Sequence, residues 1–154
     1  MGFFDGYNVS SSGMSAQRTR INVVSANIAN AKTTHTQEGG PYKKQQVVFE
    51  DILLANNNKK TNSNDVETTN NVNSDIALRG VGVKSIVQSD AKPVMRFEPA
   101  HPDANEQGYV AYPDINPVIE MVDLIEAMRS YEANVASFNA HKNIDSKTLD
   151  ILNM

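Results

Sequence analysis

The sequence predicts an α+β protein in which long N- and C-terminal helices pack as an antiparallel, coiled-coil-like pair, with a small β-rich central region and a long Asn-rich loop. Two observations support the helices and one supports the strands. Apolar residues recur at helical spacing near each end of the chain, and short runs of β-branched and aromatic residues lie between turn-forming residues in the middle. We expect residues 1–34 and 115–154 to form a terminal helical domain. The remaining residues, 35–114, should form a small β-rich central domain with a mobile loop at 56–75.

The N-terminal helix is indicated by apolar residues that recur every seven positions. They are Tyr7, Met14, Ile21 and Ile28, with Val24 three positions after Ile21. This spacing is typical of a helix that packs along one narrow stripe. The helix should end near Thr33 and Thr34, a β-branched pair shortly before Gly39-Gly40-Pro41.

The C-terminal helix should begin at Asn116 and Pro117, because asparagine is a good N-cap and proline fits the first helical position. Apolar residues then follow at steps of three and four positions: Met121, Val122, Ile125, Met128, Val135 and Phe138, with Tyr131 at the edge of the stripe. A helix of about 38 residues is about 57 Å long, which exceeds the diameter of a small domain.

The central region contains four candidate strands. They cover residues 42–49, 81–88, 94–97 and 109–112, and we expect them to form one small sheet. Residues 56–75 include eight asparagines and two apolar residues, which indicates a long solvated loop.

Composition excludes several classes of protein. The chain has 154 residues, about the size of one domain, and no cysteine, so it has no disulfide framework and no thiolate metal site. Its formal charge of −4 argues against nucleic-acid binding. No apolar run is long enough to cross a bilayer, and the first basic residue is Arg18, so we expect no cleavable signal peptide.

One segment resembles a calcium loop. Residues 103–108, followed by Asp114, come close to the EF-hand pattern, but Pro99, Pro102 and Pro113 forbid the flanking helices. We therefore expect a turn between strands there. The histidines have no paired spacing and the serine run 10–12 has no neighbouring histidine, so we predict no enzyme activity, no catalytic residues, no metal and no cofactor.

The apolar stripes at both ends indicate assembly. Basic residues are in excess in residues 1–32 and acidic residues in 115–135, which favours pairing between the two segments. One helix pair leaves a side of each helix uncovered, whereas a bundle of several copies would cover it. We therefore expect the stripes to be buried only when subunits assemble.

Several segments together carry a family resemblance. Ser25-Ala26-Asn27-Ile28-Ala29-Asn30-Ala31-Lys32-Thr33 looks like the N-terminal signature of bacterial flagellar rod and hook proteins. More discriminating are Glu38-Gly39-Gly40-Pro41-Tyr42, His101-Pro102-Asp103-Ala104, Gly108-Tyr109-Val110-Ala111-Tyr112-Pro113, Glu120-Met121-Val122-Asp123 and Tyr131-Glu132-Ala133-Asn134. Together they resemble the FlgC-type proximal rod proteins of the flagellar basal body.

The resemblance implies a structural subunit of the proximal rod, the drive shaft that transmits motor torque across the periplasm and lines the export channel. It also implies export from the cytoplasm by the flagellar type III export apparatus. The implied partners are further copies of the chain, FlgB-type and FlgF-type rod proteins, the basal-body adaptor FliE and the inner-membrane ring. Neither nucleic acid nor a small-molecule substrate is implied.

The candidate site is an assembly interface. It comprises Met14, Ile21, Val24, Asn27, Ile28, Asn30, Thr33, Met121, Val122, Ile125, Met128, Tyr131, Val135 and Phe138. Asn27, Asn30 and Thr33 should fix the register through polar contacts, or else cap the helix. The alternatives are another flagellar axial protein, a calcium-binding or hydrolytic module, and a cytoplasmic coiled-coil adaptor.

Overall fold

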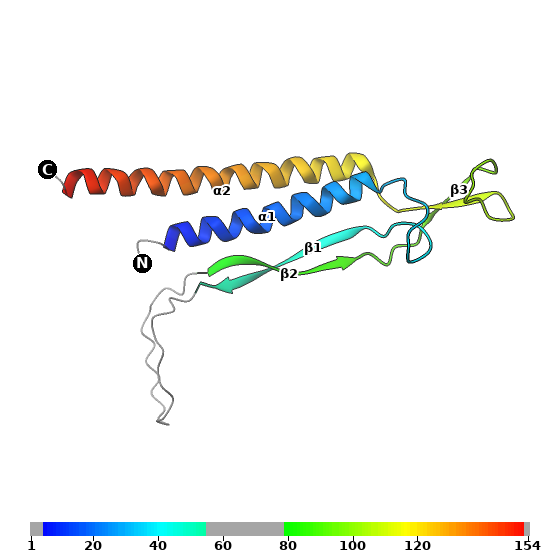
Figure 1. Cartoon of the computed structure of the whole chain (residues 1–154), viewed down its shortest axis with the longest axis horizontal. Coiled ribbons are helices and arrows are strands. Elements are labelled where there is room, and N and C mark those ends of the chain that lie inside the picture. The colour runs from blue at the N-terminus through cyan, green and yellow to red at the C-terminus, as the bar shows by residue number, and fades with distance from the viewer. Residues whose placement is uncertain (1–4, 55–78, 153–154) are drawn as a thin grey trace, which may run out of the picture.

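The described part of the chain folds into two long terminal helices and four strands, which confirms the α+β class. The structure is a computed structural model and describes residues 5–54 and 79–152. In chain order, its elements are α1 (Asp5–Ala29), β1 (Gln45–Leu53), β2 (Arg79–Gln88), β3 (Val94–Phe97), β4 (Tyr109–Tyr112) and α2 (Pro117–Leu152) (Figure 1). The expected Asn-rich loop at 56–75 lies outside the described residues.

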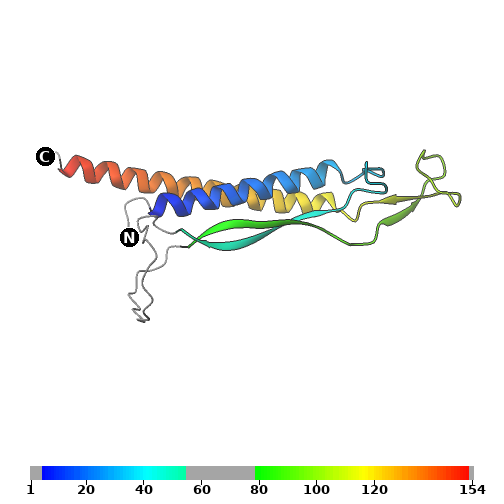
Figure 2. The same cartoon turned by 60° about the horizontal axis from the view of Figure 1, so that its bottom comes forward.

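The elements form an elongated molecule rather than a globular one. The helices α1 and α2 lie side by side and run in opposite directions, and α1 lies between α2 and the β1–β2 ribbon (Figures 1 and 2). The β3–β4 ribbon projects as an arm beyond the end where α2 begins (Figure 2). At the other end, α2 continues past the start of α1.

The start of α2 is as predicted and the end of α1 is not. The Asn116 side-chain oxygen accepts the N–H of Val118 at 3.0 Å, which is the expected N-cap. The predicted end of α1 near Thr33 is wrong, because α1 ends at Ala29. The side-chain amide of Asn30 donates to the Ala26 carbonyl oxygen at 2.9 Å, and the Thr33 hydroxyl donates to the Asn30 side-chain oxygen at 3.1 Å. The backbone leaves the helical ladder at this point, because the N–H of Ala31 bonds to the Ile28 carbonyl oxygen at 3.3 Å and that of Thr33 to the Asn30 carbonyl oxygen at 3.0 Å, which forms a turn.

The predicted single sheet is also wrong, because the strands form two separate antiparallel ribbons, β1–β2 and β3–β4. The β1–β2 ribbon runs from the pair Gln45 and Gln88 to the pair Leu53 and Arg79. Beyond Gln88 the chain reaches Pro93, which has no N–H to continue a ladder. The strands β3 and β4 have the predicted bounds, while β1 and β2 are displaced by up to four residues.

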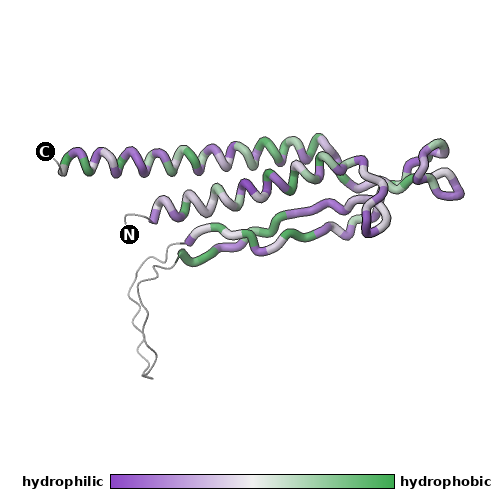
Figure 3. The backbone as a smooth tube through the Cα atoms, viewed as in Figure 1, coloured by the Kyte–Doolittle hydropathy of each residue, from purple (hydrophilic) through white to green (hydrophobic). Residues whose placement is uncertain are grey.

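The buried apolar core of the described residues is small. It consists of Ala16, Val23, Val24, Val110 and Ala127. Hydrophobic residues nevertheless recur along both helices and the β1–β2 ribbon (Figure 3), and many large ones are exposed. No helix within the described residues has the length and apolarity needed to cross a bilayer. Much of the apolar surface of the described residues is therefore exposed.

Candidate assembly surface

The contact between α1 and α2 is built from small and polar residues. A Cβ atom on Gly6 would lie 2.7 Å from the His141 ring, and one on Gly13 would lie 2.8 Å from the Asn134 side-chain oxygen. Farther along the pair, the Asn27 amide donates to the Glu120 carboxylate at 3.0 Å. These contacts recur at multiples of seven residues on both helices, which is the period of a helix pair that packs along one seam.

Polar contacts continue at both ends of this seam. The Tyr7 hydroxyl donates to the Asp145 carboxylate at 2.5 Å, and its ring packs edge-to-face on Phe138 with 4.9 Å between centroids. The hydrogen bond to Asp145, followed by burial and by the charge of Asp145, raises the pKa of Tyr7. Near the other end, the Arg20 guanidinium lies 3.8 Å from the carboxylates of Asp123 and Glu126.

The predicted apolar stripe of α1 lies one position after the seam. Ser12, one position before Gly13, faces the β1–β2 ribbon, because its hydroxyl oxygen accepts the N–H of Val81 at 3.2 Å. Each residue turns about 100° around a helix, so Met14, one position after Gly13, points away from the ribbon. Ile21 and Ile28 follow Met14 at seven-residue steps and share its side of α1.

The apolar stripe of α2 lies on the same side of the helix pair. Met121 and Val135 directly follow the seam residues Glu120 and Asn134. Because the helices run in opposite directions, one step after a seam residue leads to the same side of the pair on both helices. The result is one continuous surface, which we call the two-helix face and define as Met14, Ile21, Ile28, Met121, Ile125, Met128 and Val135.

The two-helix face is open to solvent along α2 in the single chain. The exposed fractions of Met121, Ile125 and Met128 are 51%, 52% and 46%. Its α1 residues and Val135 are half-buried at its edge. An ordered apolar surface of this kind marks an interaction site in a soluble protein.

The other predicted interface residues lie around this face. Val122 is exposed and Val24 is buried. Tyr131 is half-buried, and Phe138 packs on Tyr7 within the chain. Asn30 and Thr33 bond to each other in the turn after α1.

Asn27 occupies the centre of a buried hydrogen-bond network, and it is 1% exposed. Its amide nitrogen donates to the Gln45 carbonyl oxygen at 2.9 Å as well as to Glu120. Its side-chain oxygen accepts the N–H of Gln45 at 2.9 Å and the Tyr42 hydroxyl at 3.3 Å. The network joins α1, the start of β1 and the start of α2. Burial, together with the nearby Glu120 charge, raises the pKa of Tyr42.

Four residues of this network, Tyr42, Lys44, Gln45 and Glu120, are not among the predicted interface residues. The Lys44 ammonium lies 2.6 Å from the Glu120 carboxylate, and the Glu120 side chain is 1% exposed. The sequence suggests a dipole contact for Glu120 because it lies in the first turn of α2. The sequence does contain one signal that Glu120 is buried. Glu120, Ala127 and Asn134 follow one another at seven-residue spacing, so they share one side of α2 and form a narrow row of small or polar residues.

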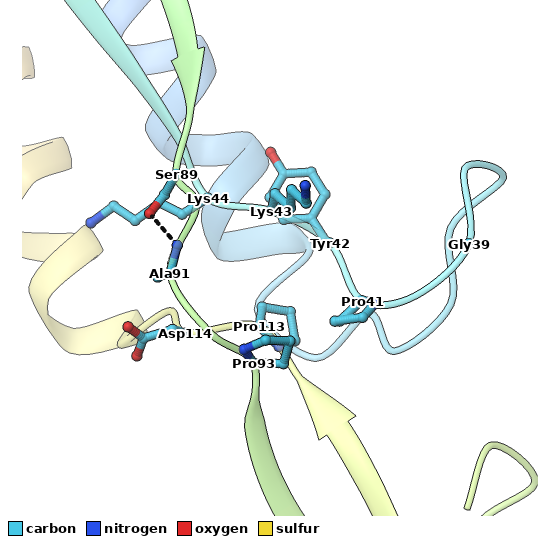
Figure 4. Close-up of a pocket in the computed structure, with 10 residues that line it drawn as sticks. All are labelled: Gly39, Pro41, Tyr42, Lys43, Lys44, Ser89, Ala91, Pro93, Pro113 and Asp114. Carbon is cyan, nitrogen blue, oxygen red and sulfur yellow. Dashed lines mark hydrogen bonds between the residues drawn. The ribbon is translucent and has the colours of Figure 1, made fainter. Parts of the chain in front are cut away.

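A small hollow marks the junction between the helices and the β3–β4 arm. It has a volume of about 110 Å³ and is lined by Pro41, Tyr42, Pro93, Pro113 and neighbouring residues (Figure 4). Small-molecule sites have volumes of about 300–1,000 Å³, so this hollow does not indicate a substrate pocket.

The segment that resembles a calcium loop is a turn in the β3–β4 arm. The Asn105 side-chain oxygen accepts the N–H groups of Gln107 and Tyr109 at 3.0 and 2.9 Å, and Gly108 has a φ of 79°. These bonds engage an oxygen that a calcium loop would supply to the ion. Within residues 5–54 and 79–152, no group of three or more acidic or histidine side chains is arranged to hold a metal.

Family models assign both ends of the chain to one class of protein. Residues 8–34 match the model of the flagella basal body rod protein, and residues 106–151 match the C-terminal model of the flagellar basal body rod FlgEFG proteins. The matched segments include nearly all of both helices, where the two-helix face lies. This fold, with its terminal helices and open apolar face, is therefore that of a flagellar basal-body rod protein.

Curated relatives define the family within this class. The flagellar basal-body rod protein FlgC of Borreliella burgdorferi is 39% identical over 99% of both chains. FlgC of Bacillus subtilis is 38% identical, over 96% of this chain and 97% of its own, and FlgC of Aquifex aeolicus is 36% identical over 97% of both. The chain belongs to the FlgC family of flagellar basal-body rod proteins. It is a structural subunit of the rod, located in the basal body, and not an enzyme.

Proposed function

We propose that this chain is a subunit of the proximal rod whose two-helix face is buried against the helices of neighbouring rod subunits. The observation that carries this proposal is the exposure of Met121, Ile125 and Met128 on a well-formed helix. Burying apolar area is worth about 25 cal/mol per Å², so neighbours that cover this face gain much of the energy of assembly.

The same face suits the transmission of torque. A drive shaft needs lateral and axial contacts that do not slip, and interdigitating side chains of mixed size resist sliding. Val122 would extend the contact on the outer side of α2. Val24, Asn27, Tyr131 and Phe138 would support the face from within the chain, while Asn30 and Thr33 hold the turn that follows α1.

The proposal extends to the surroundings of the subunit. We infer a periplasmic position, export by the flagellar type III apparatus without a cleavable signal peptide, and helices that line the export channel. The inferred partners are further copies, FlgB-type and FlgF-type rod proteins, FliE and the inner-membrane ring. The family relationship over both helices supports these inferences, because rod proteins share these segments.

An Ile125→Asp variant tests the assembly role. Ile125 is 52% exposed, so the single chain should fold normally, whereas a buried interface would hold an unpaired charge. The variant replaces the chain in flagellated cells, and its swimming and its presence in isolated basal bodies are measured. Ala133→Asp is the matched control, because Ala133 is exposed and lies one position before the seam residue Asn134, on the side of the helix pair opposite the two-helix face.

We expect Ile125→Asp to abolish swimming and to be missing from basal bodies, with Ala133→Asp close to wild type. Circular dichroism of the purified variants should show the same helix content. Normal basal bodies that contain Ile125→Asp would exclude the two-helix face as the interface. A subunit that is detected only in the cytoplasm of flagellated cells would instead favour the adaptor function.

A further inference from the structure

The start of α2 is held in place by a charge rather than by apolar packing. In the first two turns of α2, Val118, Ile119, Met121 and Val122 are more than half exposed. Glu120 is 1% exposed in the same segment. The side chains that could have anchored this end by packing thus point outward, and a carboxylate points inward.

Both oxygens of the Glu120 carboxylate have a partner from another part of the chain. One lies 2.6 Å from the Lys44 ammonium, just before β1, and the other accepts the Asn27 amide of α1 at 3.0 Å. Asn27 is held in turn by the backbone N–H and C=O of Gln45. The Lys44 side chain, 24% exposed, is the charge that neutralises Glu120.

We propose that Lys44 and Glu120 are a positioning pair that fixes the start of α2 in the orientation required for assembly. A buried carboxylate is tolerated only when it is paired, so Glu120 stays inside while Lys44 is present. Without Lys44 the carboxylate would turn to water and carry the first turns of α2 with it. This inference rests on the proposed function of the two-helix face.

The position of the pair links it to that face. Glu120 directly precedes Met121, and Asn27 directly precedes Ile28. The network therefore sets the rotation of both helices at the end of the face where the apolar side chains of α2 are most exposed. An ion pair achieves this without using any apolar residue that the neighbouring subunits need.

Three variants of the full chain test the proposal. Lys44→Met leaves Glu120 buried without its counter-charge, and Lys44→Met with Glu120→Gln removes both charges while keeping an acceptor for Asn27. Lys43→Met removes the neighbouring exposed lysine and is the matched control. Hydrogen exchange of the purified proteins reports on residues 117–123, and swimming of complemented cells reports on assembly.

We expect Lys44→Met to speed exchange over 117–123 by roughly 100-fold, with residues 130–141 unchanged, because an unpaired buried charge favours local opening. Swimming should be lost. The double variant should restore most of the protection and of the swimming, and Lys43→Met should match wild type. If Lys44→Met does not fold, the proposal still requires that the double variant and Lys44→Arg both fold and protect residues 117–123 from hydrogen exchange.

Two results would overturn the proposal. One is that residues 117–123 of Lys44→Met are as well protected from hydrogen exchange as in the wild type, or that the double variant protects them no better than Lys44→Met does. In either case Lys44 would not act through Glu120. The other is normal swimming by Lys44→Met cells despite lost protection, since orientation would then not matter for assembly. Neither result affects the assembly role of the face, which Ile125→Asp tests separately.

Discussion

Gly13 and Asn134 approach each other so closely that a methyl group on Gly13 would lie 2.8 Å from the Asn134 side-chain oxygen. The Asn134 amide donates to the Ser130 carbonyl oxygen at 2.9 Å, so the side chain is not free to move aside. Glycine at this position brings the two helices together, although glycine weakens a helix by about 1 kcal/mol relative to alanine.

Gly13→Val should destabilise the chain by about 1–3 kcal/mol, the usual cost of overpacking a close contact. Urea unfolding followed by circular dichroism measures this change. Ser15→Val places the same side chain at an exposed position of α1 and should change stability by less than about 0.5 kcal/mol. Equal effects of the two substitutions would show that the contact with Asn134 does not limit helix approach.

Asn27→Ala should be among the most damaging polar substitutions in the chain. It leaves both backbone groups of Gln45 and one oxygen of Glu120 without their partner in a buried site. The expected loss is about 2–4 kcal/mol of unfolding free energy, because each unsatisfied buried group costs about 1–3 kcal/mol. Asn22→Ala, on the exposed side of α1, is the control. If Asn27→Ala lowers the unfolding free energy no more than Asn22→Ala does, the network adds no net stability.

Gly108→Ala should disturb the β3–β4 arm and leave the helices intact. Gly108 has a φ of 79°, and a Cβ there would lie 2.9 Å from the Phe97 ring. Phe97 stacks edge-to-face on Tyr109 with 5.4 Å between centroids. Chemical shifts of the two rings should change, whereas those of α1 and α2 should not. Gly39 has a similar φ of 87°, but a Cβ there would have no atom within 4 Å. Gly39→Ala therefore introduces the backbone strain without the steric contact.

The parts of the fold that the sequence predicted well depend on local signals. The N-cap Asn116 and the proline after it fix the start of α2, and the strands β3 and β4 are bounded by prolines and by a turn with glycine. The end of α1 was missed because the Asn30 side chain bonds within its own turn, which a count of apolar residues does not register.

The helix seam could not be predicted from apolar spacing because most of the large apolar residues of the predicted stripes lie beside it. Glycine at position 13 and the polar residues Asn27 and Glu120 take part in the contact, and of the stripe one position later Met121 and Met128 remain exposed. The pair of Lys44 and Glu120 joins residues far apart in the sequence, and only the tertiary structure brings them together. The sequence thus indicated which residues are apolar, but not which of them the single chain leaves uncovered.

The hydrogen bond between Tyr7 and Asp145 should make the end of the helix pair sensitive to alkaline pH. The bond to Asp145, with burial and the charge of the carboxylate, raises the pKa of Tyr7, so the folded chain favours the neutral phenol. Its contribution to stability is fully present below the ordinary pKa of tyrosine and is lost as the pH rises through the raised pKa.

Asp145→Asn should therefore move the titration of Tyr7 to lower pH. Nuclear magnetic resonance of ring-labelled tyrosines measures this shift. Tyr112 is an internal control, because its pKa is raised by a separate hydrogen bond to Glu98 at 2.9 Å and should not respond to Asp145→Asn. Tyr7→Phe identifies the Tyr7 signal and keeps the ring against Phe138. An unchanged Tyr7 titration in Asp145→Asn would mean that the carboxylate does not hold the phenol, and that α2 is not fixed to the start of α1 by this bond.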